Sequence, residues 1–226
     1  MHIILLIVLI TALVFGPQWW AKYTFARYAK KLERLPGSGG ELARHLLDRF
    51  AMKEVTVEIT EQGDHYDPEA KAVRLMVNNY NDNSLTAIAV AAHEVGHAIQ
   101  HHNKEAKLIL RTRLVKIAHK SAKIGSVLMF VMPLVMVVTR SPIIGILFGL
   151  LGLVSIAGSA VIHLVTLPVE WDASFGKALP ILKQDYIEKQ DHAAVERILK
   201  AAALTYVAAS LASILNVWRW IALLRR

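Results

Sequence analysis

The chain has 226 residues, 54% of them hydrophobic, and a mean hydropathy of +0.39, and its hydrophobic residues occur in long uninterrupted runs. This composition argues against an ordinary soluble domain and is typical of membrane proteins, while the absence of cysteine excludes disulfides, thiolate zinc sites and cysteine nucleophiles. The formal net charge is +8, but Lys and Arg flank the apolar runs, so we expect a lipid bilayer rather than nucleic acid as a partner.

Four apolar runs are predicted to form transmembrane helices. The first lies within residues 1–21, and we expect it to be retained rather than cleaved as a signal peptide, because Lys and Arg follow it and do not precede it. Residues 124–167 contain two runs, which predict a membrane hairpin. Residues 201–226 contain the fourth run, which Asn216 and Arg219 interrupt.

Lys and Arg are distributed unequally on the two sides of these runs. They cluster in residues 22–123 and 168–200, whereas the opposite side carries only Arg140, Arg225 and Arg226. Because positive charge favours the cytoplasmic side, this pattern predicts a multi-pass protein of the cytoplasmic membrane with both polar segments in the cytoplasm.

The segment 22–123 is predicted to be a small α+β domain. A helix is expected over Glu41–Met52, and the alternating stretches Val55–Ile59 and Lys71–Val77 predict two strands, joined by turn residues as an antiparallel hairpin. Asn81–Ser84 offers N-caps for a following helix. The expected fold class is therefore a mainly α integral membrane protein of about four transmembrane helices, with a small cytoplasmic zincin-like α+β domain.

The predicted helix after these caps contains the stretch "AAHEVGHAIQHH". His93 and His97 are four residues apart, so a helix projects both imidazoles from one face, where both can reach one ion at about 2.0–2.1 Å. Glu94 lies next to the first histidine and can act as the general base on a metal-activated water. This H-E-x-x-H spacing predicts a zinc site.

His101 continues the four-residue spacing, but helix geometry argues against it as a ligand. The eight residues from His93 to His101 cover about 12 Å of helix axis, too far for one ion to bind both. His101 and His102 are therefore expected to be exposed polar residues.

The third ligand has to come from another segment. Glu170 is the favoured candidate, because the predicted membrane hairpin returns the chain to the side of the histidines, and a carboxylate at that boundary is costly to desolvate unless it is paired or binds a metal. Asp172 is expected to accept the second N–H of a ligand histidine. Other candidates lie upstream: Glu54, Glu58, Glu61, Asp64, His65, Asp67, Glu69 and Asp82.

Three motifs resemble the YugP-like family of membrane zinc metallopeptidases: "DHYDP", "AAHEVGHAIQH" and "LPVEWDAS", in this order. The layout also resembles the HtpX-type membrane proteases, in which two spans separate the histidine helix from a glutamate ligand. The resemblance implies zinc as the cofactor, with His93, His97 and Glu170 as ligands. Those proteases carry E-x-x-x-D around the glutamate, and here Ser174 stands in place of that Asp.

The predicted function is that of a gluzincin-like zinc endopeptidase facing the cytoplasm, acting on membrane-associated or unfolded polypeptides. Val73–Met76 is expected to be a sheet edge that pairs with an extended substrate, and His65 and Tyr66 are candidates for stabilising the oxyanion. The alternative is a non-hydrolytic membrane zinc-binding or scaffold protein. A zinc transporter would need ionisable residues within the spans, where Arg219 and His163 are the main ones.

Overall fold

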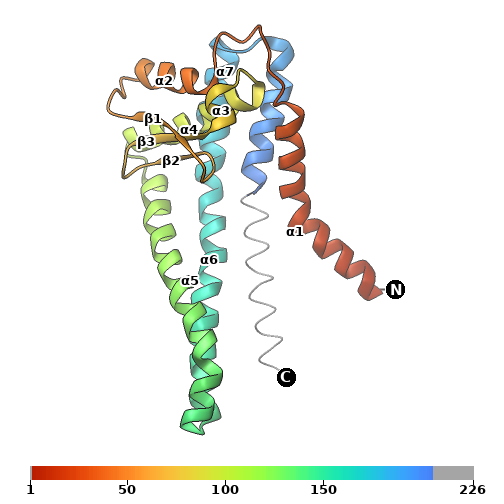
Figure 1. Ribbon diagram of the computed structural model, residues 1–226, viewed down its shortest axis with the longest axis vertical. Helices are drawn as coiled ribbons and strands as arrows, with labels where there is room; N and C mark the ends of the chain where they lie inside the picture. Colours follow the sequence, from red (N-terminus) through yellow and green to blue (C-terminus); the bar gives the residue numbers. More distant parts are fainter. Residues whose placement is uncertain (1, 206–226) are drawn as a thin grey trace. The chain divides into compact units, whose positions relative to one another are not determined.

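The computed structural model describes residues 2–205 (Figure 1). Contacts divide the chain into two units, which are described separately. The described part of the first unit consists of residues 2–16 and 110–167, and the second unit consists of residues 17–109 and 168–205.

The first unit is built from parts of three helices. These are α1 (His2–Arg27), α5 (Ala106–Thr139) and α6 (Pro142–Trp171), each of which also contributes residues to the second unit. All three contain long stretches of aliphatic residues, and α5 and α6 expose many of them.

The prediction of about four transmembrane helices in a multi-pass protein is wrong. Within residues 2–205, one helix is both long and apolar enough to cross a membrane, and this helix is α5. A span needs about 20 consecutive apolar residues. Among the residues whose side chains the structure describes, α6 contributes the shorter apolar stretch Ile143–Gly152. Most of the predicted fourth span, residues 206–226, lies outside the described residues.

The second unit is a helical α+β fold around a small sheet. Its first part contains α2 (Gly39–Arg49), β1 (Thr56–Thr60), β2 (His65–Asp67), β3 (Ala72–Met76), α3 (Val77–Asn81) and α4 (Leu85–His102). Its second part follows α6 and contains the π-helix η1 (Asp172–Ala178), α7 (Leu179–Asp185) and the short 3₁₀-helix η2 (Lys189–Asp191), after which residues 192–205 are helical. The described residues thus form a mainly helical α+β fold with three short strands, with one candidate membrane span where about four were predicted.

The sheet has the strand order β1–β3–β2, which corrects the predicted hairpin. β1 pairs with β3 in parallel, with Thr56 opposite Ala72, and β2 pairs with β3 antiparallel, with His65 opposite Arg74. The prediction treated the connection between the two strands as a turn, but it contains β2, which occupies the antiparallel position beside β3. Because β3 is central, the expectation that Val73–Met76 forms a free edge for substrate is also wrong.

Helix α4 is the central element of this unit. It contacts α2, the sheet, η1 and α7, and most of its residues are buried. Its N-terminus is capped as the sequence predicts, because the Ser84 hydroxyl accepts a hydrogen bond from the Ala87 N–H at 3.1 Å. Leu46 and Leu47 of α2, Leu75 of β3 and Leu182 of α7 are fully buried in the same core. Burial of such a side chain stabilises the fold by about 1.5–3 kcal/mol.

Candidate metal centre

Helix α4 places the two motif histidines in the interior of the second unit. His93 and His97 are 7% and 4% exposed, and their rings lie 4.7 Å apart at a steep angle. Glu94 is also buried. The spacing of four residues therefore brings both imidazoles to one buried face, as the helical reading of the motif predicts.

Glu170, in the last turn of α6, meets both histidines. Its Oε2 atom lies 3.2 Å from Nε2 of His93 and 3.1 Å from Nε2 of His97, and the side chain is fully buried. Burial on its own would raise the pKa of this carboxyl, but the charges and hydrogen bonds of His97 and His93 lower the pKa of Glu170 well below its ordinary value. A buried carboxylate is thus held in its charged form against two imidazoles.

The donor atoms of these three residues fit a zinc ion. All lie within 4.8 Å of one another. Two ligands at about 2.0–2.1 Å from one ion in tetrahedral geometry are separated by roughly 3.3 Å, which is close to the separations between the Glu170 oxygen and the two nitrogens. The chemistry also fits, because zinc accepts imidazole nitrogen and carboxylate oxygen, and a set of three protein ligands is typical of catalytic zinc sites.

The second ring nitrogen of each histidine has its own partner. Nδ1 of His93 lies 3.0 Å from the Ser174 hydroxyl, and Nδ1 of His97 lies 3.0 Å from Oε1 of Gln100. Such outer contacts orient the imidazoles of metal sites. Neither Ser174 nor Gln100 was predicted as a partner of a ligand histidine. Helical spacing could have pointed to both residues, because side chains three or four positions apart lie on one face of a helix. Ser174 follows Glu170 by four residues, and Gln100 follows His97 by three.

Asp172 contacts His97 through Gln100, and not directly as expected. Its Oδ2 atom accepts hydrogen bonds from Nε2 of Gln100 at 2.8 Å and from Nζ of Lys177 at 3.0 Å. Burial would raise the pKa of Asp172, but these two bonds lower it below its usual value. The expected histidine N–H is therefore not the partner shown for Asp172, which instead holds the amide that contacts His97.

The expected oxyanion residues have other partners. The Tyr66 hydroxyl lies 2.8 Å from Nδ1 of His101, and Nδ1 of His65 lies 2.8 Å from the Gly63 carbonyl oxygen. Burial and nearby acidic groups raise the pKa of Tyr66 to about 12. His102 is exposed as expected, but His101 is only partly exposed, because its ring packs against Tyr66.

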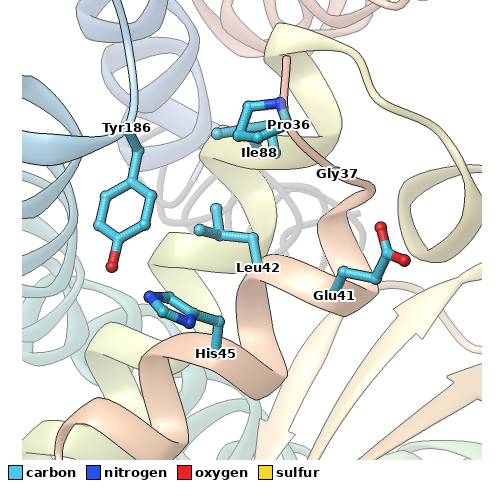
Figure 2. Close-up of a pocket in the computed structure, with 7 residues that line it drawn as sticks. All are labelled: Pro36, Gly37, Glu41, Leu42, His45, Ile88 and Tyr186. Atoms are coloured by element: carbon cyan, nitrogen blue, oxygen red, sulfur yellow. The ribbon is translucent and has the colours of Figure 1, made fainter.

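The second unit contains two cavities that are lined by residues outside the histidine–glutamate group. One of them lies between α2, α4 and the end of α7 and has a volume of about 340 Å³. Figure 2 shows this cavity, in which the rings of His45 and Tyr186 make an edge-on contact. It is lined by Pro36, Gly37, Glu41, Leu42, His45, Ile88 and Tyr186. The other, of about 370 Å³, includes Tyr66, His101 and His102 in its lining. Neither of these two cavities includes His93, His97 or Glu170 in its lining.

Two comparisons with known proteins give matches that extend over nearly the whole chain. Residues 3–225 match the protein family described as "Putative neutral zinc metallopeptidase". The chain is 32% identical over 223 residues to a Bacillus subtilis (strain 168) protein named "Putative membrane protease YugP", covering 96% of each chain. No solved structure gives a significant match. With the match extending over nearly the whole chain, the protein belongs to this family of zinc metallopeptidases.

Proposed function

We propose that this chain is a zinc-dependent endopeptidase in which His93, His97 and Glu170 hold the metal and Glu94 is the general base. The observation that carries the proposal is the buried group of two imidazoles and a carboxylate, whose donor atoms lie within 4.8 Å of one another. Family membership implies a polypeptide substrate. We extend this to unfolded or membrane-associated polypeptides.

The chemistry follows from the roles of the four side chains. A bound zinc ion supplies a Lewis acid that polarises the scissile carbonyl and makes water a stronger nucleophile. Glu94 takes the proton of the attacking water and returns it to the leaving amine. His93, His97 and Glu170 stay in place throughout, because each is buried and each histidine has a partner for its second nitrogen.

We also propose that the enzyme works at the cytoplasmic face of a membrane. Support comes from the name of the Bacillus subtilis relative, a "Putative membrane protease", and from α5, which is long and apolar enough to enter a bilayer. The basic residues of segment 22–123 favour the cytoplasmic side.

The substitution Glu94→Gln tests the enzyme reading. It replaces the base by an isosteric amide, so we expect casein hydrolysis by the purified full chain to fall by about 10²–10⁴-fold. Bound zinc should stay at about one ion per chain, since the three ligands are unchanged. Elemental analysis and a peptide-release assay measure the two quantities.

Glu170→Gln is the matched comparison, because it makes the same chemical change in a proposed ligand. We expect this variant to lose bound zinc together with activity. If the wild-type chain binds zinc but cleaves no unfolded polypeptide, the endopeptidase proposal is wrong and a non-hydrolytic zinc-binding protein replaces it.

A further inference from the structure

We propose that Gln100 is a positioning residue of the metal centre, whose side-chain amide, held by Val169 and Asp172, makes His97 present its Nε2 atom to the metal. The inference rests on the proposed function, because His97 needs this orientation only if it binds zinc. No motif in the sequence assigns a role to Gln100.

Gln100 is buried and makes a full set of hydrogen bonds. It is 1% exposed and follows His97 by one helical turn on α4. Its Nε2 atom donates to the Val169 carbonyl oxygen at 3.0 Å and to Oδ2 of Asp172 at 2.8 Å, and its Oε1 atom lies 3.0 Å from Nδ1 of His97. Both amide protons and the amide oxygen are therefore used.

The partners allow only one orientation of this amide. A carbonyl oxygen and a carboxylate oxygen can only accept hydrogen bonds, so the NH₂ group has to face Val169 and Asp172. Flipping the amide would place Oε1 against two other acceptors. The oxygen therefore faces His97, and because it cannot donate, Nδ1 of His97 has to carry a proton. The Nε2 atom of His97, on the side of Glu170, is then the nitrogen that can bind a metal.

His93 has no equivalent constraint. Its Nδ1 atom faces the Ser174 hydroxyl, which can either donate or accept a hydrogen bond. A hydroxyl supports the ring but does not select which nitrogen carries the proton. The two proposed histidine ligands are thus positioned by different means, and the tautomer is imposed at His97.

Asp172, which accepts a hydrogen bond from Gln100, is itself fixed by an ion pair with Lys177. Nζ of Lys177 lies 3.0 Å from Oδ2 of Asp172 and 3.1 Å from Oε1 of Glu105. Gly176 makes room for Asp172, because a Cβ atom at position 176 would collide with the Asp172 carboxylate. A chain of polar contacts therefore runs from Glu105 through Lys177, Asp172 and Gln100 to His97.

Zinc affinity of the full-length chain, measured by competition with a chromophoric chelator, tests the proposal. Gln100→Leu removes the acceptor for His97, and we expect zinc binding to weaken by about 10–100-fold. Gln100→Glu should also weaken it, because the second carboxylate oxygen would face Val169 and Asp172 without a proton between them. The double substitution Gln100→Glu/Asp172→Asn restores a donor opposite the carboxylate and should recover most of the affinity.

Thr86→Val is the matched control on the same helix. It also removes a buried polar contact, the bond from the Thr86 hydroxyl to the Phe25 carbonyl oxygen, but touches no residue of the metal centre. We expect its melting temperature to fall and its zinc affinity to stay unchanged. This separates positioning from general loss of stability.

Two results would overturn the proposal: wild-type zinc affinity in Gln100→Leu, or a double variant that binds no more tightly than Gln100→Glu alone. The nitrogen chemical shifts of His97 in the metal-free wild type decide the same point without a variant, since an unprotonated Nδ1 would contradict it. A wild-type chain that binds no zinc would instead refute the proposed function at its first step.

Discussion

At the scale of single residues, Gly96 shows why the motif helix can approach the segment that carries Glu170. A Cβ atom at this position would lie 2.8 Å from the Ala173 carbonyl oxygen, which is closer than side chains and backbone normally come. Ala173 is fully buried between Asp172 and Ser174, in η1. Gly96 therefore sets the separation between α4 and η1 and, with it, the contact between Glu170 and the histidines.

Gly96→Ala is expected to destabilise the protein although alanine favours helices. The gain in helix propensity is about 1 kcal/mol, whereas displacing the η1 backbone costs about 1–3 kcal/mol. We also expect weaker zinc binding, because Glu170 would move away from His93 and His97. Urea unfolding in the presence of chelator and zinc titration measure these two effects. A variant that is more stable and binds zinc normally would show that the close contact is not required.

At the scale of elements, the sequence predicted strands and helices better than their pairing. The helix over Glu41–Met52 corresponds to α2, and the strands over Val55–Ile59 and Lys71–Val77 correspond to β1 and β3. Local periodicity and capping are readable because they depend on near neighbours. Strand order depends on contacts that local sequence does not specify, and the three-residue strand β2 resembled a turn.

His101 of α4, which contacts Tyr66 of β2, is expected to make the stability of the fold depend on pH. Burial, together with the nearby charges of Lys71 and His102, lowers the pKa of His101 below its ordinary 6.5. As the pH falls, the unfolded chain therefore binds a proton at His101 before the folded chain does. The stabilisation is present above about pH 6.5 and is lost as the pH falls through the lower pKa of the folded state.

His101→Gln keeps a polar partner for Tyr66 but does not titrate. We expect the free energy of unfolding of this variant to fall less than that of the wild type between about pH 7.5 and about pH 5. Urea denaturation with chelator present measures the difference. An equal fall in both proteins would mean that His101 does not contribute to the pH dependence.

At the scale of the whole molecule, α5 is the element that bears on membrane association. Phe130 and Leu134 lie one turn apart on this helix and are 86% and 63% exposed. Exposed aromatic and aliphatic side chains at this spacing form an apolar surface that favours lipid. We expect the chain to sediment with membranes and to resist extraction by alkaline carbonate.

Phe130→Asp/Leu134→Asp should release the chain into the soluble fraction, because each Asp at the centre of a membrane helix costs about 2.5–3.5 kcal/mol. The matched control Phe130→Leu/Leu134→Ile keeps the apolar surface and should remain with the membrane. Immunoblots of the two fractions measure the distribution. A wild-type chain that carbonate extracts would contradict insertion of α5.

The sequence by itself determined the half of the site that one helix can hold. The spacing of His93, Glu94 and His97 and the cap at Ser84 depend only on helix geometry, which repeats every 3.6 residues whatever the rest of the chain does. It also singled out Glu170, through a topology of membrane spans that the structure does not support. Glu170 does lie beside both histidines, although the predicted membrane spans that pointed to it are not found.

Only the tertiary structure decided what surrounds this half-site. It brought Glu170 to both imidazoles across 77 and 73 residues of chain, and it placed Gln100 and Ser174, rather than Asp172, on the second ring nitrogens. It also put β3 in the centre of the sheet, where the sequence predicted an edge. The physical reason is that contacts between distant segments, such as those of Glu170 and Ser174 with the histidines, are selected by packing, which local spacing does not encode. Gln100 lies one turn from His97 on the same helix, and here packing decides only that its amide faces the imidazole.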